Sequence, residues 1–202
     1  MIVLGLTGSI GMGKSTAAKM LRDHRVPVSD ADAIVHELIG HGGAAVAAVD
    51  RAFAGVVADG AVDRAALGAR VFGDSAALKQ LESILHPLVE AARDRFLKQC
   101  QRRREPVVAL DIPLLFEVKA DALCDATIVV TAPQFVQTTR VLSRPGMTRE
   151  KLEGIRRHQM SDLEKRRRAT FVVPSGAGRR ATFMALARIV RLAKARKLHR
   201  EL

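Results

Sequence analysis

The chain has 202 residues, of which 48% are apolar and 27% are charged, a balance typical of a folded domain with a sizeable core. This composition argues against a disordered tail, a collagen or a coiled coil, and no apolar run reaches the roughly 18 residues that a membrane span needs. No basic segment precedes the first apolar run, and Cys100 and Cys124 lack CxxC spacing, so we expect a cytoplasmic protein without disulfides, membrane contact or a cysteine zinc site.

The formal net charge of +12 is unevenly distributed. Residues 1–136 carry 15 basic and 16 acidic side chains, whereas residues 137–202 carry 18 and 5. A basic segment attracts polyanions, but the chain has seven Phe and no Trp or Tyr on which single-stranded nucleic acid would stack. We therefore expect a phosphate-rich small ligand and no nucleic acid, with a nucleic-acid-binding ATPase as a distant alternative.

Apolar runs alternate with helical patterns along the chain, which predicts βαβ units, a parallel sheet and an α/β fold. Strands are expected at Ile2–Leu6, Val26–Ser29, Val107–Leu110, Thr127–Thr131 and Phe171–Val173. Helices are expected at Lys14–His24, Thr148–Gln159 and Arg179–Leu198. The interval Ala31–Glu105 shows no convincing strand pattern and is several times longer than a crossover needs, so it predicts a helical insertion.

A glycine-rich segment follows the first expected strand and opens the first expected helix. It reads Gly8-Ser9-Ile10-Gly11-Met12-Gly13-Lys14-Ser15 and matches the pattern G-x-x-x-x-G-K-[ST]. The glycines let backbone N–H groups approach phosphate oxygens, and the helix N-terminus adds positive potential. Lys14 is expected to reach the β and γ phosphates, and the Ser15 hydroxyl to ligate Mg²⁺. The segment predicts a nucleoside triphosphate site with a magnesium ion.

The use of the triphosphate depends on other residues. A GTPase needs D-x-x-G and N-K-x-D elements, and the run from Val107 to Pro113 contains neither. Asp111 follows the expected strand Val107–Leu110, where an acidic side chain either helps to hold Mg²⁺ or lies in an ordinary turn. We favour the metal role for Asp111 because the phosphate loop lies upstream.

Four further groups of residues accompany the phosphate loop. They are Asp30-Ala31-Asp32, Leu85-His86-Pro87, the run from Asp111 to Glu117, and Arg140 and Arg144 followed by Arg156 and Gln159. Together with Gly8 to Thr16, they resemble the dephospho-CoA kinase family across most of the chain. The resemblance implies ATP-dependent phosphorylation of the ribose 3′-hydroxyl of dephospho-CoA, the last step of coenzyme A synthesis.

The resemblance also implies an architecture. It predicts a P-loop kinase fold with a five-stranded parallel sheet flanked by helices. The core would comprise residues 1–32, 106–136 and 163–202, with a helical substrate domain over 33–105 and a basic lid over 137–162. A monomer is the default expectation. Another P-loop kinase, acting on a nucleoside monophosphate or a small alcohol, is the alternative that shares this physics.

Residue roles follow from the same resemblance. Asp32 resembles the acid that takes or orients the 3′-hydroxyl proton, with Asp30 as the second candidate, although one of the two also fits as the cap of the following helix. Arg140 resembles the arginine that stabilises the transferring phosphoryl group, and Lys14 is the other cationic residue expected to act in catalysis. Arg144, one helical turn later, would share the face of Arg140 and contact the nucleotide. Nucleotide contacts are further expected from Gly8 to Thr16, with Thr16 the last of them.

Substrate contacts are expected from four more residues. His86 precedes Pro87, and it either marks a kink between helices and contacts the substrate or is a buried histidine satisfied by the backbone. Pro113, Leu114 and Glu117 follow the C-terminal end of a strand, where ligands of open α/β sheets bind.

The sequence departs from the family pattern in two places. Ser9 follows Gly8 where paired glycines are commoner, and the run from Ala169 to Pro174 replaces the usual Ala-Asp and later Asn. The nucleotide contact that the family pattern assigns to that last segment therefore does not carry over to this chain by motif. The basic run Lys165–Arg168 fits a solvated face or a rim that attracts phosphate.

Overall fold

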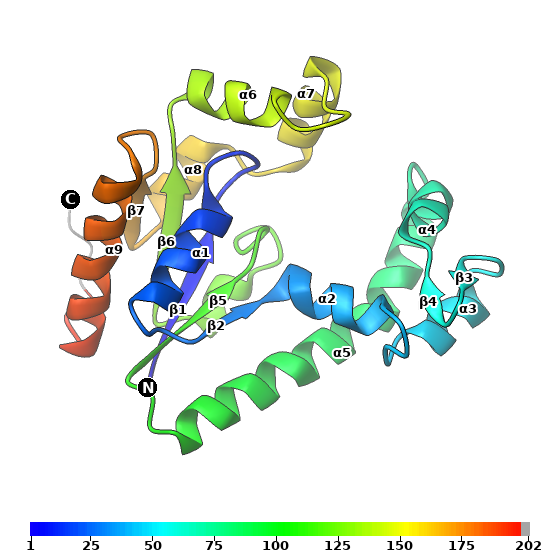
Figure 1. Cartoon of the computed structure of the whole chain (residues 1–202), viewed down its shortest axis with the longest axis horizontal. Helices are drawn as coiled ribbons and strands as arrows, with labels where there is room; N and C mark the ends of the chain where they lie inside the picture. The colour runs from blue at the N-terminus through cyan, green and yellow to red at the C-terminus, as the bar shows by residue number, and fades with distance from the viewer. Residues whose placement is uncertain (199–202) are drawn as a thin grey trace. The chain divides into compact units, whose positions relative to one another are not determined.

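The computed structural model describes residues 1–198, so the last four positions of the expected core segment 163–202 lie outside the described residues. The chain divides into two compact units (Figure 1). The first unit comprises Met1–Ser29 and the described chain from Cys100 onward, and the second comprises Asp30–Gln99. The sequence places the corresponding boundaries at 33 and 105.

A five-stranded parallel sheet in the order β2-β5-β1-β6-β7 forms the centre of the first unit. Its strands are β1 (Ile2–Thr7), β2 (Val28–Asp30), β5 (Val107–Asp111), β6 (Ala126–Thr131) and β7 (Phe171–Pro174). Strand β1 pairs in parallel with β5 and β6, and β6 pairs in parallel with β7. All of β5 is buried, as in parallel sheets that are covered on both faces. The predicted α/β class and the five expected strands are confirmed.

The first unit also contains helices, which cover the two faces of this sheet or lie beyond its edge. They are α1 (Lys14–Asp23), α6 (Gln134–Leu142), α7 (Arg149–His158), α8 (Asp162–Arg168), α9 (Arg179–Lys194) and the short 3₁₀ helix η1 (Ala120–Leu123). Leu21 of α1 and Leu186 of α9 pack with Ile128 in one core cluster, whereas Val129 packs with Phe116 in another. Successive side chains of β6 therefore point to opposite faces, as a strand requires.

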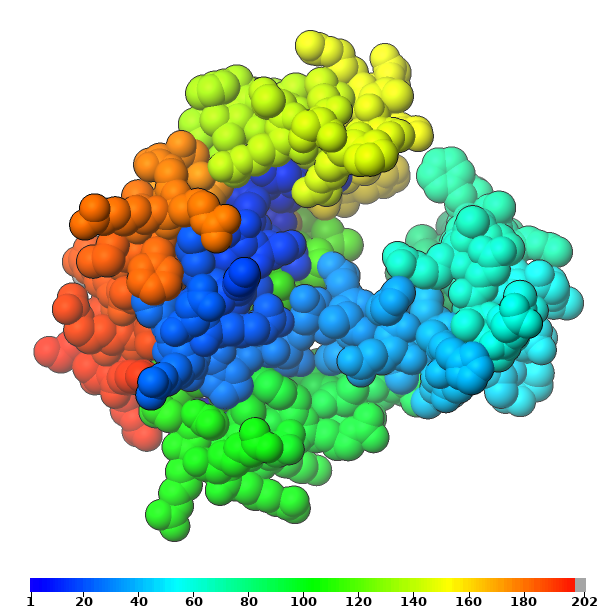
Figure 2. Space-filling model, viewed as in Figure 1, coloured from blue at the N-terminus to red at the C-terminus, as the bar shows by residue number. Residues whose placement is uncertain are grey.

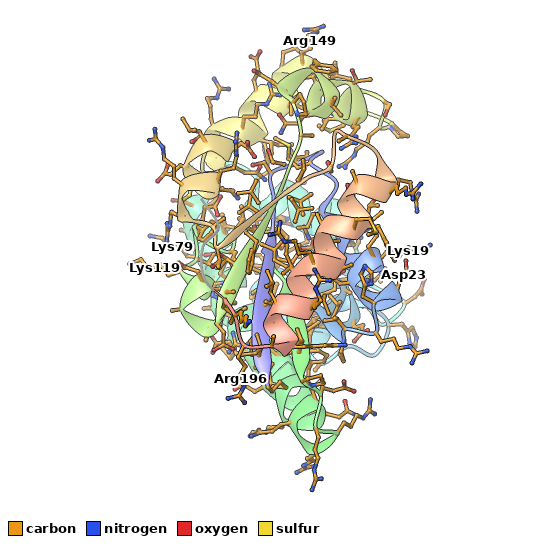
Figure 3. The ribbon with its side chains drawn as sticks, turned by 90° about the vertical axis from the view of Figure 1, so that its left-hand side faces the viewer. Lys19, Asp23, Lys79, Lys119, Arg149 and Arg196 are labelled. Atoms are coloured by element: carbon orange, nitrogen blue, oxygen red, sulfur yellow. The ribbon has the colours of Figure 1, made fainter. Side chains whose placement is uncertain are left out.

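The last helix is shorter than predicted. Figure 3 shows α9 crossing the sheet, with Arg196 beyond its lower end. The expected end at Leu198 is wrong, because α9 ends at Lys194 and Arg196 adopts a left-handed conformation with φ of 55°. A residue with positive φ cannot continue a right-handed helix.

The second unit is mostly helical. It contains α2 (Ala31–Ile39), α3 (Val46–Ala52), α4 (Arg64–Val71) and most of α5 (Ser75–Arg102), which enclose a separate apolar cluster. The expectation of no strand is wrong at one place, where β3 (Val57–Ala58) and β4 (Ala61–Val62) form an antiparallel hairpin. The dipeptide Asp59-Gly60 explains it, because both residues have positive φ, which a tight hairpin turn requires. Among residues 1–198, no helix is long and apolar enough to cross a membrane.

Candidate functional site

The glycine-rich segment joins β1 to α1 and has the conformation of an anion-binding loop. Gly11 and Gly13 have φ of 75° and 91°, a region that glycine enters without strain. A Cβ on Gly8 would lie 2.7 Å from the Val130 carbonyl oxygen, so this position also requires glycine. Because α1 begins at Lys14, its first backbone N–H groups lack intrahelical partners at the same end of the loop.

Lys14 and Asp111 form an ion pair beside this loop. Lys14 Nζ lies 2.7 Å from Asp111 Oδ1, and the Asp111 side chain is 1% exposed. Leu6 pairs with Asp111 in the sheet, so the end of β5 lies beside the end of β1 where the loop begins. Lys14 and Asp111 are two of the site residues expected from the sequence. The structure brings them together although they lie 97 positions apart in the chain.

The same edge of the sheet carries oxygen groups of the kind that magnesium prefers. Asp111 supplies a buried carboxylate, and Ser15 supplies an exposed hydroxyl in the first turn of α1. Within residues 1–198, no three His, Cys, Asp or Glu side chains gather into a metal cluster. Mg²⁺ in phosphate-transfer sites is usually bound by one or two carboxylates plus the phosphates of the substrate, so the donor set fits this ion.

Arg140 is anchored next to the start of α1. Its Nη1 and Nη2 donate to Ser175 Oγ and to the Ser175 carbonyl oxygen, both at 2.9 Å, and Ser175 Oγ donates to the Met12 carbonyl at 2.6 Å. A cavity of about 270 Å³ opens here, lined by Gly13, Thr16, Arg140, Ser175, Arg179 and Thr182 among others. Arg140 thus lies beside the phosphate loop, through Ser175 and Met12.

Arg144 does not share a helical face with Arg140. Helix α6 ends at Leu142 with Ser143 as its C-cap, and Arg144 is exposed beyond that end. The expected geometry is wrong because Pro145 disfavours helical conformation in the residue before it.

The remaining loop residues contact the part of the first unit that follows β6. Ser9 and Met12 are buried, and Met12 Sδ accepts from the Ala132 N–H at 3.1 Å. Ile10 is bound through its backbone to side chains of residues 137 and 159. Figure 2 shows the yellow-green segment of α6 and α7 lying against the dark blue N-terminal segment that contains the loop.

The two acidic residues at the junction of β2 and α2 have different roles. Asp30 is the N-cap of α2, and its Oδ1 accepts from the Ala33 N–H at 3.1 Å. Asp32 lies in the first turn of α2 and is exposed, with no hydrogen bond in the described chain. The helix cap that the sequence expects of one of the pair is therefore Asp30.

His86 lies on the surface of the second unit. Helix α5 continues from Ser75 to Arg102 with Pro87 inside it, so Pro87 does not separate two helices. The alternative of a buried, backbone-satisfied His86 is wrong because this side chain is exposed.

A buried lysine of α8 holds the segment after β5 in place. Lys165 is 0% exposed, and its Nζ lies 2.9 Å from Glu117 Oε1 and 3.5 Å from the Pro113 carbonyl oxygen. The same Glu117 oxygen accepts from the Met160 N–H at 2.9 Å, whereas Leu114 is partly exposed. The expectation of a solvated face is wrong for Lys165, because its charge is paired inside the protein.

The ion pair makes stability depend on pH. Burial raises the pKa of Glu117, but hydrogen bonds from Lys165 and the Met160 N–H outweigh it, so the pKa lies below its ordinary value of 4.5. A lowered folded-state pKa stabilises the fold above the unfolded-state pKa, and this contribution is lost as the pH falls through the folded-state pKa. We expect the urea midpoint to fall below about pH 4.5 more steeply in the natural protein than in Glu117→Gln. Equal pH profiles of the two proteins would contradict this.

The divergent segment Ala169–Pro174 is held by a pair of hydrogen bonds between Thr170 and Thr127. Thr170 Oγ1 accepts from the Thr127 N–H, and Thr127 Oγ1 accepts from the Thr170 N–H, both at 3.0 Å. These bonds join the start of β7 to β6. The Thr170 side chain is therefore directed at Thr127 and not at the phosphate loop. The residue from this region that does reach the loop is Ser175.

Sequence reasoning missed Ser175, Gln137 and the burial of Lys165. Ser175-Gly176 directly after an apolar strand was the available signal for a loop at the C-terminal edge of the sheet. Gly176 fits closely there, since a Cβ would lie 2.6 Å from Pro133 Cδ. No local pattern indicates that Gln137 contacts a residue 127 positions earlier.

A phosphate loop after β1, an acid at the end of the adjacent β5 and this strand order define a P-loop nucleotide-binding protein. The family model of dephospho-CoA kinase matches residues 2–179. The dephospho-CoA kinase of Paramagnetospirillum magneticum is 63% identical over 82% of this chain and 78% of its own, and that of Mesorhizobium japonicum is 56% identical over 88% and 89%. The chain belongs to the dephospho-CoA kinase family.

Solved structures agree with this assignment at the level of the fold. The crystal structure of TT1252 from Thermus thermophilus is 36% identical, with a TM-score of 0.82 over 94% of this chain and 96% of that one. The dephospho-CoA kinase from Campylobacter jejuni has a TM-score of 0.64 at 20% identity, over 95% of this chain and 96% of its own. The predicted P-loop kinase fold is confirmed.

Proposed function

We propose that this chain transfers the γ-phosphoryl group of ATP to the ribose 3′-hydroxyl of dephospho-CoA, which gives coenzyme A and ADP and completes coenzyme A synthesis. The observation that carries the proposal is the Lys14–Asp111 pair at the phosphate loop of a chain that belongs to this kinase family. In the transfer, the acceptor oxygen forms a bond to the γ-phosphorus while the bond from that phosphorus to the β–γ bridging oxygen breaks. The hydroxyl proton leaves to a carboxylate or to water.

The nucleotide would bind along the start of α1. Backbone N–H groups from Gly8 to Thr16 would bind the phosphates, and Lys14 would reach the β and γ groups. The cavity beside Arg140 and Ser175 is open at the same end of α1 and suits the nucleoside part of ATP. Arg140 would stabilise charge on the transferring group once it exchanges Ser175 for phosphate oxygens, with exposed Arg144 as a second contact.

Ser15 and Asp111 would hold Mg²⁺. When bound, this ion neutralises phosphate charge and orients the leaving group. The Lys14 ammonium lies 2.7 Å from Asp111 Oδ1, so the loop's own lysine holds this carboxylate in place at the edge of the sheet.

Asp32 would orient the acceptor hydroxyl and accept its proton. It suits this role because it is exposed and carries no hydrogen bond, whereas Asp30 is occupied as a helix cap. Phosphoryl transfer depends mainly on positioning and charge neutralisation, so Asp32 orients more than it abstracts. His86, Pro113, Leu114 and Glu117 stay predictions as substrate contacts, and the geometry favours Glu117 as a support for that segment.

We expect Asp32→Asn to lower kcat by about 10², because the amide keeps the shape but has neither the charge that orients the hydroxyl nor the basicity to accept its proton. Asp50→Asn, an exposed acid of the same unit without a hydrogen bond, is the matched control and should turn over normally. Steady-state rates with saturating ATP and acceptor measure the difference. Turnover of Asp32→Asn within twofold of the natural protein would remove Asp32 from the mechanism.

A basic lid over residues 137–162 is part of the proposal. Closure of this segment over bound nucleotide would exclude water and limit hydrolysis of ATP. Hydrogen exchange of 137–162 should therefore slow when ATP and Mg²⁺ are added. Unchanged exchange in this segment would contradict the lid.

The substrate assignment is tested by comparing acceptors. ADP release is measured with ATP, Mg²⁺ and either dephospho-CoA, AMP, adenosine, a shikimate-type alcohol or RNA. Phosphorylation of dephospho-CoA in strong preference to the others supports the proposal, and preference for AMP or a small alcohol would favour another P-loop kinase. Stimulation by RNA alone would favour a nucleic-acid-binding ATPase. Cytoplasmic location and a monomeric state stay predictions.

A further inference from the structure

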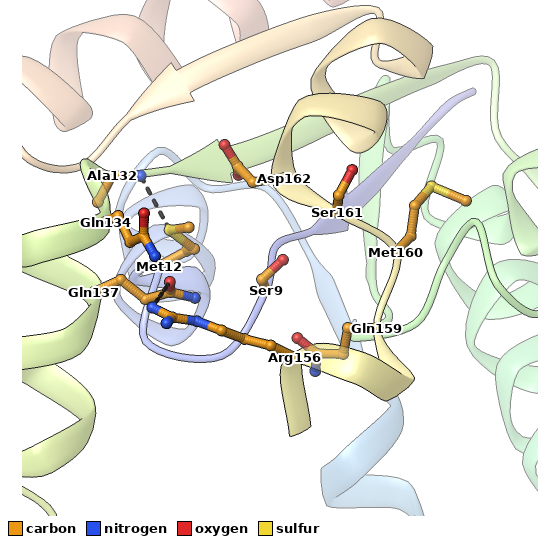
Figure 4. A pocket seen from close by; sticks show the side chains of 10 residues that line it. All are labelled: Ser9, Met12, Ala132, Gln134, Gln137, Arg156, Gln159, Met160, Ser161 and Asp162. Atoms are coloured by element: carbon orange, nitrogen blue, oxygen red, sulfur yellow. Dashed lines mark hydrogen bonds between the residues drawn. The ribbon is translucent and has the colours of Figure 1, made fainter. Parts of the chain in front are cut away.

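Two consecutive peptide groups of the phosphate loop are bound by glutamine side chains from outside the loop. The Ile10 N–H donates to Gln159 Oε1 at 3.2 Å, and the Ile10 carbonyl accepts from Gln137 Nε2 at 2.8 Å. Gln137 lies in α6, and Gln159 directly follows α7 (Figure 4). Both helices therefore hold the loop at one residue. We call Gln137 and Gln159 the glutamine clamp.

Arg156 braces the clamp. Its Nη2 donates to Gln137 Oε1 at 2.6 Å and to Thr138 Oγ1 at 3.1 Å, which ties α7 to α6. A backbone N–H, a backbone carbonyl and a guanidinium each have a fixed role as donor or acceptor, so together they fix which end of each amide faces which partner. Gln137 must donate to Ile10 and Gln159 must accept from it. Gln137 is 4% exposed, so water does not readily replace the hydrogen bonds of its side chain.

The clamp determines the direction of a neighbouring donor. The Ile10 carbonyl and the Gly11 N–H belong to one planar trans peptide and point to opposite sides of it. Because the carbonyl is held toward α6, the Gly11 N–H is turned to the opposite side of the loop. Within residues 1–198, this N–H donates no hydrogen bond. A Cβ on Gly11 would lie 2.5 Å from Val141 Cγ2, so α6 forms a close wall behind the loop.

We propose that Gln137 and Gln159 are positioning residues for nucleotide binding, which hold the loop so that the Gly11 N–H is directed at a phosphate oxygen. This inference rests on the proposed nucleotide site. A loop that is already in its binding conformation does not have to be ordered by the ligand, so the clamp raises affinity for the triphosphate without touching it. The clamp acts on the nucleotide and not on the acceptor.

The test exploits the opposite hydrogen-bonding roles of the two glutamines. Gln137→Glu keeps the partner of Arg156 but removes the donor to the Ile10 carbonyl, whereas Gln159→Glu keeps the acceptor for the Ile10 N–H. We expect the Kd for ATP with Mg²⁺, measured by calorimetry without acceptor, to rise about tenfold in Gln137→Glu and less than about threefold in Gln159→Glu. Gln159→Met, which removes the acceptor, should also raise it about tenfold.

Simple repulsion of ATP predicts the reverse order, because Arg156 would neutralise a carboxylate at 137, whereas the hydrogen-bond partner of Gln159 is the uncharged Ile10 N–H. Gln134→Glu is the control, since Gln134 is an exposed residue of α6 outside the clamp and should bind ATP normally. Melting temperatures show whether each variant folds. If Gln137→Glu does not fold, the comparison of Gln159→Met with Gln159→Glu tests the proposal.

Kinetics give a second readout. The KM for dephospho-CoA should stay within twofold in Gln137→Glu while the KM for ATP rises. Equal weakening of ATP binding in Gln137→Glu and Gln159→Glu, or normal binding in Gln137→Glu and Gln159→Met, would overturn the clamp. If the variants show the predicted order of ATP affinities but the natural protein does not phosphorylate dephospho-CoA, the clamp is supported and the proposed acceptor is wrong. Failure of the natural protein to bind ATP would overturn both.

Discussion

Replacing Lys14 by Met is expected to lower kcat by about 10² to 10³ while the protein still folds. Lys14 begins α1 at the phosphate loop, and its ammonium pairs with Asp111 at 2.7 Å. Removing a preorganised cationic donor from a transferring phosphoryl group leaves developing negative charge without its partner, and losses of this size follow from a single such donor. Methionine keeps most of the length of the side chain but removes the ion-pair partner of the buried Asp111, so a loss of stability accompanies the loss of charge.

The matched control for this change is Lys19→Met. Lys19 is an exposed lysine of the same helix without a partner in the described chain, so its loss changes net charge by the same amount. Single-turnover rates at saturating ATP, with melting temperatures for both variants, separate catalysis from folding. A Lys14→Met protein that turns over like Lys19→Met would show that the loop does not act as a phosphate site.

Replacing Lys165 by Met is expected to destabilise the fold by about 3 kcal/mol. Breaking one side of a buried ion pair costs about 3–5 kcal/mol because the other charge stays buried without its partner. The Glu117 side chain is 18% exposed and keeps the Met160 N–H as donor, which favours the lower end of this range. Urea unfolding at pH 7 measures the loss.

The double variant Lys165→Met with Glu117→Gln distinguishes a buried charge from poor packing. Glutamine keeps an acceptor for the Met160 N–H and carries no charge, so the double variant should recover to within about 1 kcal/mol of the natural protein. Arg166→Met, at the exposed position next to Lys165, should change stability by less than about 0.5 kcal/mol. A double variant as unstable as Lys165→Met alone would attribute the cost to packing.

Local patterns predicted the sheet and the phosphate loop because their causes are local. Continuous apolar runs such as β5 are what a parallel strand needs, and Gly11 and Gly13 are required by the backbone conformation itself. The sequence placed Asp111 at the end of a strand, and the structure adds that this strand lies beside β1, which brings Asp111 to Lys14.

Contacts that depend on distant parts of the chain were not predictable in this way. The run Lys165–Arg168 has the composition of a solvated face, yet Lys165 is buried because Glu117, 48 positions earlier, lies opposite it. Gln137 and Ser175 reach the loop through the packing of α6 and of the chain after β7, and neither carries a motif. Asp59-Gly60 is different, because its hairpin signal was present and local.

The most direct test of the account is to identify the product formed from ATP, Mg²⁺ and dephospho-CoA. Phosphorus NMR and mass spectrometry of the purified product, with ADP quantified beside it, report both the transfer and the position of the new phosphate. The account predicts a phosphomonoester on the ribose 3′-oxygen, formed in equal amount with ADP, and almost none with Lys14→Met. ADP without a phosphorylated acceptor, or a phosphate on another oxygen, would contradict it.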